Sequence, residues 1–432
     1  MVFINLGQSL KDGGLTQSLI RTDKPDQDDY STVFHFNLAG SILIYLLIFT
    51  GAPFIADFYK QESLVDIIRV YGLTIIISGF TSIQLTRLTK EMDFKTQMII
   101  SVPSLVISGL VGIFLAYRGL GVWSLVWSGI IQAVVNSAQL WWYGKWSPSF
   151  TFSKEKFKEH FSFGYKMTLT SILNTVFTNI YQILIGRFFI ASQVGFYTRA
   201  SSVRQLPVTN LSKALDKVTY PLFASIQNDD VRLKRAYKEI MQMVIFIVAP
   251  VLIFLCSLGE PLFRFLFTEK WLPAVPYFQV LCIAGILFPV HSYNLNILKV
   301  KGRSDLFLKL EIIKKILIIV TIFVSFKFGI MGLVWGQVFT SVASLFINTY
   351  YSGKFISYTT WDQLKDIFPI IAFATIVGVL IYIIDQQLQE IGIFDFYRLI
   401  IGGTFGILIF SGLSWFFTRS VIDSFKRIIL RK

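Results

Sequence analysis

The chain consists largely of apolar runs, each about 20 residues long, which recur from one end to the other. A helix of that length crosses the hydrocarbon core of a bilayer. Apolar residues make up 54% of the chain and charged residues 15%, whereas charged residues are about 25% of an ordinary soluble domain. The sequence therefore predicts an all-α polytopic membrane protein. We expect about twelve spans, near residues 31–58, 64–86, 97–117, 121–143, 161–190, 195–226, 239–259, 274–297, 305–327, 329–351, 366–385 and 397–417.

Basic residues gather in alternate connections between these spans. One set of connections holds most of them, in residues 21–24, 87–95, 145–158, 232–238, 299–303 and 419–432 and at Lys354. The other set holds little beyond Lys60, Arg118, Arg264, Lys270 and Lys327. Connections rich in Lys and Arg face the cytoplasm, so we expect a cytoplasmic C-terminus. The formal charge of +14 is spread through these connections and does not indicate nucleic-acid binding.

The span over residues 195–227 differs from the others because it carries charges along its length. These charges are Arg199, Arg204, Lys213, Asp216 and Lys217. One charged side chain at bilayer depth costs about 2.5–3.5 kcal/mol, so this helix should face protein or water. Arg199, Lys213 and Lys217 fall near one stripe of the helix, which we interpret as the wall of a cationic cavity that binds an anion. The alternative is a basic amphipathic helix on the membrane surface, or pairing of the lysines with Asp216.

Three other arginines are candidates for the same anion site. Arg204 lies on the other side of the charged helix, across the kink expected at Pro207. Arg187 closes the preceding span and could instead reach the outer interface. Arg69 lies within the span 64–86, where an ion pair with Asp66 at i,i+3 spacing would explain it equally well.

The two halves of the chain resemble each other weakly. GAPFIADFY is similar to GEPLFRFLF, and GVWSLVW is similar to GIMGLVW, with each pair 208 positions apart. The matched segments run in the same direction, which predicts two helical lobes from a parallel repeat around a central cavity. We expect an N-terminal lobe over residues 1–146, a C-terminal lobe over 161–352 and two additional helices over 365–418. The repeat also predicts that the N-terminal lobe lacks its first helix and part of its second.

Side chains that commonly bind metals or perform catalysis are scarce. The chain has only two Cys and three His, and none of them occurs at metal-ligand spacing: Cys256, Cys282, His35, His160 and His291. We expect packing or interfacial roles for these residues. No nucleophile-elbow, zinc-protease or phosphate-loop motif occurs. We therefore expect no cofactor, no metal, no catalytic residue and no enzymatic activity.

Several stretches, taken in order, resemble the Wzx-type polysaccharide flippases of the multidrug/oligosaccharidyl-lipid/polysaccharide (MOP) exporter superfamily. They are DGGLTQSLIR, YSTVFHFNLAGS, GRFFIASQVGFYTRASSVRQLPV, YPLFASIQ and FTEKWLPAVPYFQVLCIAG. The resemblance implies two six-helix lobes, often followed by two further helices. It also implies movement of an undecaprenyl pyrophosphate-linked oligosaccharide across the bacterial plasma membrane, for lipopolysaccharide or exopolysaccharide synthesis. The implied partners are this lipid, membrane lipids and other polysaccharide-assembly membrane proteins.

Two acidic residues are candidates for coupling to a cation. Asp12 falls in the DGG stretch of the resemblance, although the neighbouring Gly13 and Gly14 could simply end a helix there. Asp216 lies among the cations of the charged helix.

Other functions stay open at this point. A membrane polysaccharide polymerase would carry a large outward connection, and the outward connections here are short. An acyltransferase needs a positioned His within the membrane, for which only His35 is placed. A drug or cation antiporter of the same superfamily should have an acidic cavity, whereas the cavity predicted here is basic.

Overall fold

The computed structural model describes residues 2–11, 14–22, 24–144 and 146–417. Over these ranges the chain forms helices and no strands. Eight described segments are long and apolar enough to cross a membrane: Gln27–Tyr59, Leu64–Lys90, Phe94–Tyr117, Asp230–Ser257, Glu269–Val300, Gly329–Phe355, Thr360–Glu390 and Asp395–Trp415. The predicted all-α, multi-pass fold class is therefore confirmed.

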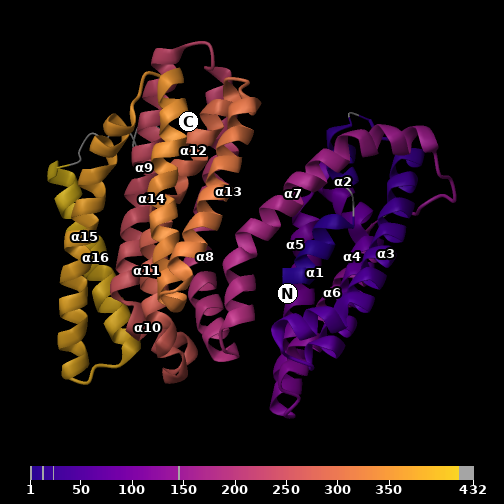
Figure 1. Cartoon of the computed structure of the whole chain (residues 1–432), viewed down its shortest axis with the longest axis horizontal. Coiled ribbons are helices and arrows are strands. Elements are labelled where there is room, and N and C mark those ends of the chain that lie inside the picture. Colours follow the sequence, from indigo (N-terminus) through magenta and orange to yellow (C-terminus); the bar gives the residue numbers. More distant parts are fainter. Residues whose placement is uncertain (1, 12–13, 23, 145, 418–432) are drawn as a thin grey trace. The chain divides into compact units, whose positions relative to one another are not determined.

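The helices form two compact units, Met1–Phe188 and Phe189–Lys432 (Figure 1). The first unit contains α1 (Val2–Leu10), α2 (Leu15–Arg21), α3 (Gln27–Tyr59), α4 (Leu64–Lys90), α5 (Phe94–Tyr117), α6 (Val122–Tyr143) and α7 (Lys154–Phe188). The second contains α8 (Ala191–Ser225), α9 (Asp230–Ser257), α10 (Gly259–Phe267), the 3-10 helix η1 (Glu269–Ala274), α11 (Val275–Gly285), α12 (Phe288–Val300), α13 (Ser304–Phe326), α14 (Gly329–Phe355), α15 (Thr360–Glu390) and α16 (Asp395–Phe417).

The boundary between the units lies after α7. The predicted N-terminal lobe ends at residue 146, whereas the first unit of the structure includes α7, because this helix packs on α1, α2 and α3. The two divisions rest on different criteria, packing in one case and the sequence repeat in the other. The three-part division over 1–146, 161–352 and 365–418 stays a prediction.

Four long helices fall outside the eight apolar segments. They are α6, α7, α8 and α13, with 22, 35, 35 and 23 residues. Each is long enough to span a bilayer, but α8 and α13 interrupt their apolar residues with charges. These helices include the charged span that the sequence sets apart.

The two landmark glycines of the repeat both have positive φ at the start of a helix. Gly121, with φ 54°, is the N-cap of α6, and Gly329, with φ 71°, is the first residue of α14. Glycine reaches this region without the steric cost that a Cβ brings. Helix α6 then packs on α5, and α14 packs on α13. The structure thus repeats one glycine-initiated helical hairpin, one copy in each unit.

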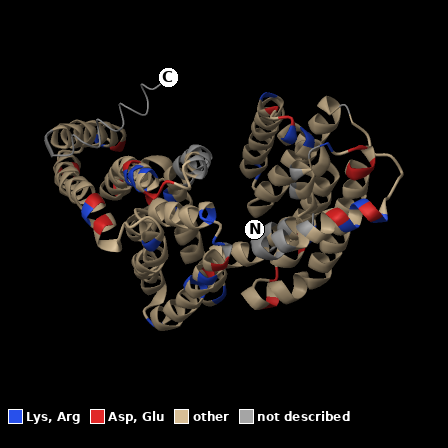
Figure 2. Cartoon of the chain, turned by 90° about the horizontal axis from the view of Figure 1, so that it is seen from above, with Lys and Arg blue, Asp and Glu red and all other residues tan. Residues whose placement is uncertain are grey.

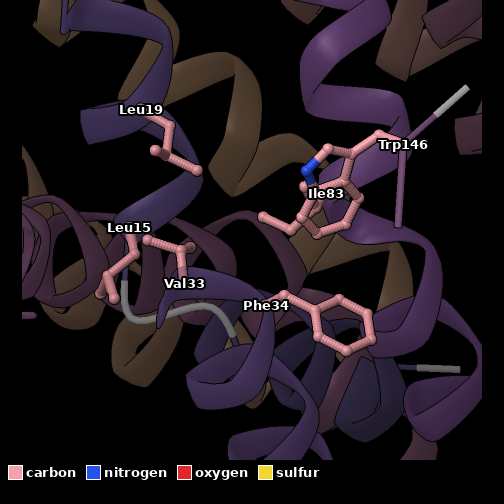
Figure 3. Packing of buried hydrophobic residues seen from close by; sticks show 6 residues of the cluster. All are labelled: Leu15, Leu19, Val33, Phe34, Ile83 and Trp146. Atoms are coloured by element: carbon pink, nitrogen blue, oxygen red, sulfur yellow. The ribbon is translucent and has the colours of Figure 1, made fainter. Parts of the chain in front are cut away.

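A buried apolar cluster seats the short helix α2 in the first unit (Figure 3). It consists of Leu15, Leu19, Val33, Phe34, Ile83 and Trp146. Leu15 and Leu19 are four residues apart, so they share one face of α2. The indole of Trp146 lies 5.9 Å from the ring of Phe34, centroid to centroid, and its Nε1 donates to Gln27 Oε1 at 2.6 Å. This packing places Ser18, between the two leucines, next to α7.

Candidate functional site

Two of the predicted site arginines lie against α3 in the first unit. Arg69 of α4 places its guanidinium carbon 4.5 Å from the centroid of Phe49, and its Nε donates to the Phe49 carbonyl at 3.4 Å. Arg187 of α7 lies 5.1 Å from the centroid of Phe58, and its buried Nη1 has no hydrogen-bond acceptor. The alternative ion pair of Arg69 with Asp66 does not form within the described residues.

Two further predicted arginines lie on α8 in the second unit. Arg199 is exposed, with its guanidinium carbon 4.9 Å from the centroid of Phe267 and 5.2 Å from that of Trp271. Arg204 is half-buried, and its Nε is buried without an acceptor. Gly285 of α11 makes room for this side chain, because a Cβ there would lie 3.3 Å from Arg204 Cδ. The two arginines therefore have different surroundings, although they share one helix.

The four arginines share one electrostatic feature. Among the described residues, none of them forms an ion pair with a carboxylate, although cations on α10, α13 and α16 do. Lys314 pairs with Glu311 at 2.5 Å, Arg264 with Glu260 at 2.7 Å and Arg398 with Asp385 at 2.8 Å. Figure 2 shows that charged residues are sparse along both units. Unpaired cations within membrane helices commonly mark a substrate or ion path.

The other predicted site residues cannot be placed. The backbone of α8 includes Lys213, Asp216 and Lys217, but their side chains lie outside the described part of the chain, as does all of Asp12. The cationic stripe and the coupling roles of the two aspartates therefore stay predictions.

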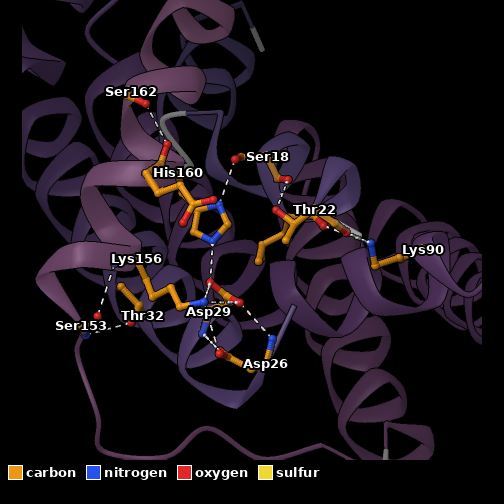
Figure 4. A network of polar contacts seen from close by, with 12 residues as sticks. Ser18, Thr22, Asp26, Asp29, Thr32, Lys90, Ser153, Lys156, His160 and Ser162 are labelled. Atoms are coloured by element: carbon orange, nitrogen blue, oxygen red, sulfur yellow. Dashed lines mark hydrogen bonds and ion pairs between the residues drawn. The ribbon is translucent and has the colours of Figure 1, made fainter. Parts of the chain in front are cut away.

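Sequence reasoning missed a polar network that joins α2, α3 and α7 (Figure 4). At its centre the buried carboxylate of Asp29 faces His160 of α7, with Oδ1 3.1 Å from Nε2. The other imidazole nitrogen lies 2.8 Å from Ser18 Oγ of α2. His160 is fully buried, so this Ser-His-Asp arrangement offers no access to a substrate. The arrangement resembles a hydrolytic triad only in its residue types.

Lys156 binds two carboxylates at the edge of this network. Its ammonium lies 3.1 Å from Asp29 and 3.2 Å from Asp26. Asp26 is the N-cap of α3 and forms a reciprocal capping box with Asp29. The backbone N–H of Asp29, and then Lys156, hold the pKa of Asp26 below its usual value. Hydrogen bonds to Asp29 and Asp26 raise the pKa of Lys156 in turn.

The sequence contains weak signals for this network. Asp26 and Asp29 have the spacing of a capping box before an apolar run, and Lys156 and His160 are four residues apart on one helix face. His160 is expected from the sequence to pack rather than to bind a ligand, and the structure buries it. Its polar partners lie 131 and 142 positions away along the chain, so local spacing could not identify them.

The second unit has a buried ion network of its own. Arg398 of α16 makes two hydrogen bonds to Asp385 of α15, and it also pairs with Asp395 at 2.8 Å. Arg264 of α10 reaches Asp395 at 3.4 Å. Each of these cations faces a carboxylate, so the network joins the last two helices to α10 and offers no free charge to a ligand.

Known proteins resemble this chain over most of its length. A family model described as polysaccharide biosynthesis protein matches residues 1–276. The teichuronic acid biosynthesis protein TuaB of Bacillus subtilis (strain 168) is 30% identical over 69% of this chain and 62% of its own length. The lipopolysaccharide biosynthesis protein WzxC of Escherichia coli (strain K12) is 25% identical over 80% of this chain and 72% of its own. The chain thus spans less than two thirds of TuaB.

Two kinds of solved structure share the fold. The lipid II flippase MurJ, in an inward closed conformation, superposes with a TM-score of 0.73 at 15% identity, over 97% of this chain and 90% of MurJ. An inward-facing multidrug resistance MATE family transporter of the MOP superfamily superposes with a TM-score of 0.61 at 18% identity, over 83% of this chain and 88% of its own. At these identities the likeness establishes the fold alone.

Proposed function

The chain belongs to the polysaccharide biosynthesis protein family, and we propose that it moves a lipid-linked oligosaccharide across a bacterial plasma membrane. The cargo would be undecaprenyl pyrophosphate carrying a sugar repeat unit, destined for a surface polysaccharide. The names of TuaB and WzxC, which concern teichuronic acid and lipopolysaccharide synthesis, support this class of product. The MurJ fold supports a lipid-linked cargo.

The observation that carries the proposal is the absence of carboxylate partners for Arg69, Arg187, Arg199 and Arg204 among the described residues. A pyrophosphate is anionic and must pass a layer in which a bare charge is costly. Guanidinium groups make charge-assisted hydrogen bonds to phosphate oxygens, often two at a time. Arg187 and Arg204 each have a buried N–H without an acceptor, and these are the donors that an anion would need.

We propose alternating access of the two units as the mechanism, because each unit is compact by itself and the family fold is that of transporters. We also propose a cytoplasmic C-terminus, which the excess of Lys and Arg in alternate connections supports. Membrane lipids and other polysaccharide-assembly membrane proteins are the proposed partners.

The competing functions have less support. His35, the residue an acyltransferase would need, lies 2.8 Å from the carbonyl of Ser149 through Nε2 and is thereby engaged with the backbone. A cation antiporter with the MATE fold should present unpaired acids along the spans. Carboxylates without an ion pair also occur on the described spans, but Asp57 and Asp66 are exposed near helix ends, whereas Arg204 has a buried N–H without an acceptor.

Transport can be tested with the full chain in liposomes that contain a fluorescent undecaprenyl pyrophosphate oligosaccharide. In empty liposomes, a membrane-impermeant quencher added outside reaches only the half of the label that lies in the outer leaflet. We expect the chain to move the labelled lipid between leaflets, so that the quencher reaches more than half of the label. Folded protein that moves no more label than empty liposomes would contradict the proposal. A labelled phospholipid serves as the control cargo and should not be moved.

A further inference from the structure

His160 is a buried titratable side chain at the meeting point of three helices in the first unit. Its Nδ1 lies 2.8 Å from Ser18 Oγ of α2, and its Nε2 lies 3.1 Å from Asp29 Oδ1 of α3. The side chains of His160 and Asp29 are 1% and 2% exposed. An imidazole in this position is largely shielded from water, and its described hydrogen-bonding neighbours are Ser18 and Asp29.

The charges around His160 are unbalanced when the imidazole is neutral. Asp29 and Asp26 supply two negative charges, and Lys156 supplies one positive charge to both. On α2 the described group facing the ring is the Ser18 hydroxyl, and on its own helix Glu159 is exposed. A protonated His160 would bring the group of four ionisable side chains to neutrality.

Both protonation states of His160 can keep both of its hydrogen bonds. With a neutral ring, the Ser18 hydroxyl donates to Nδ1 and the Nε2–H donates to Asp29. With a protonated ring, both nitrogens donate, and Ser18 Oγ becomes the acceptor. The Ser18 hydroxyl can reverse in this way because a serine oxygen both donates and accepts. The protonated form adds an ion pair between α7 and α3 and a charge-assisted hydrogen bond from α7 to α2.

Helix α2 is short and has a neighbouring helix at each of its ends. It has seven residues and follows Gly14, whose φ is 73°. Gly14 packs so closely on Gly164, one turn beyond His160, that a Cβ on Gly14 would overlap the Gly164 carbonyl. At the other end of α2, the Lys90 ammonium binds the carbonyls of Leu19, Ile20 and Thr22 (Figure 4). Thus α7 holds the start of α2 and α4 holds its end.

We propose that His160 is a proton-binding site that controls how firmly α2 and α3 are attached to α7. The imidazolium tightens the attachment, and the neutral ring loosens it at α2 first, since α3 keeps the ion pairs of Asp29 and Asp26 with Lys156. This device belongs to the first unit and does not depend on which cargo the protein carries.

The test measures the separation of α2 and α7 by electron paramagnetic resonance in lipid nanodiscs. Spin labels are placed at I20C and K158C, both exposed positions, in a full chain with C256A and C282A. We expect a narrow distance distribution near pH 5 and a broader one near pH 8, the two limits of histidine titration. His160→Gln keeps hydrogen-bonding capacity but does not titrate, so its distribution should not change with pH.

His35→Gln is the matched control, because it removes another histidine of the same unit that bonds only a backbone carbonyl. It should leave the pH response intact. Asp29→Asn supplies a second variant if His160→Gln does not fold: without the carboxylate, a protonated ring gains no ion pair with α3, so the pH response should weaken. A distribution that does not change with pH in the parent, or a response that survives His160→Gln, would overturn the proposal.

Discussion

Arg398 and Asp385 form a two-pronged ion pair that joins α16 to α15 in the second unit. Nε donates to Oδ1 at 2.9 Å and Nη2 donates to Oδ2 at 2.8 Å, and both side chains are 1% exposed. In lipid, such a pair satisfies two charges that would otherwise each be costly. The contrast with the four unpaired arginines yields the first two predictions.

Arg398→Gln should strongly destabilise the protein, because it leaves the Asp385 carboxylate buried without a cation. Breaking a buried pair from one side costs about 3–5 kcal/mol. Unfolding in mixed micelles measures this loss. Arg235→Gln is the control: it removes an exposed i,i+4 pair with Glu239, and such pairs contribute only about 0.3–0.5 kcal/mol. Equal losses in the free energy of unfolding would show that the buried pair of Arg398 and Asp385 contributes no more than an exposed pair.

Arg204→Gln should weaken ligand binding without weakening the fold. Its guanidinium has no carboxylate partner within the described residues, so its removal leaves no buried charge behind. A hydrogen bond to a charged group is worth about 1.5–3 kcal/mol, which corresponds to a loss of about tenfold or more in affinity for undecaprenyl pyrophosphate. Calorimetric titration measures the affinity, and thermal melting checks the fold.

Arg118→Gln is the matched control for this substitution. Arg118 also lies over an aromatic ring, 5.2 Å from the centroid of Phe114, but it is exposed at the end of α5. We expect Arg118→Gln to leave the affinity of the protein for undecaprenyl pyrophosphate unchanged. A lower melting temperature for Arg204→Gln, with unchanged affinity, would give Arg204 a structural role instead.

Gly14→Ala should destabilise the first unit more than Gly119→Ala does. Both glycines have positive φ, 73° and 83°, so alanine meets a similar backbone cost of about 1–2 kcal/mol at each position. At Gly14 the new methyl group would also strike the Gly164 carbonyl, whereas nothing lies within 4 Å of a Cβ at Gly119. Melting curves of the two variants isolate the cost of the contact between α2 and α7. Similar decreases in melting temperature would show that the contact between Gly14 and Gly164 adjusts to a methyl group at little cost.

The Asp26 cap should make stability depend on pH in the acid range. Its pKa in the folded state is lowered from 3.8, chiefly by the Asp29 N–H. The contribution of the carboxylate is therefore fully present above the unfolded pKa and is lost as pH falls through the lower folded value. The difference in melting temperature between the parent and Asp26→Asn should be constant above about pH 5 and shrink in stronger acid. A difference that grows on acidification would contradict this assignment.

The fold could be predicted from the sequence because membrane helices are recognised by their length and apolar composition. Gly121 and Gly329 show that a weak repeat among apolar residues can mark positions that share a positive φ at the start of a helix. The candidate site could be predicted only in part from the sequence. Charges within apolar spans identify Arg69 and Arg204 as unusual, but whether a carboxylate lies nearby is decided by packing between helices.

The His160 network illustrates the limit most clearly. His160 lies 142 and 131 positions from Ser18 and Asp29 along the chain. Each of the three also has an ordinary local explanation: Ser18 as a small polar residue, Asp29 as part of a cap, His160 as an interfacial ring. Arg398 and Asp385 are closer, 13 positions apart. A single acid and a single base in consecutive apolar spans predict an ion pair. This prediction holds only if the two spans pack side by side.

The ion network at the end of the chain has a practical consequence. Since α15 packs on α9 and α16 packs on α10, whatever displaces the second unit must also displace the turn between its two final helices. Phe394, in that turn, is 78% exposed. A fluorophore attached there would act as an external probe, and a change in its orientation would report any movement of the second unit.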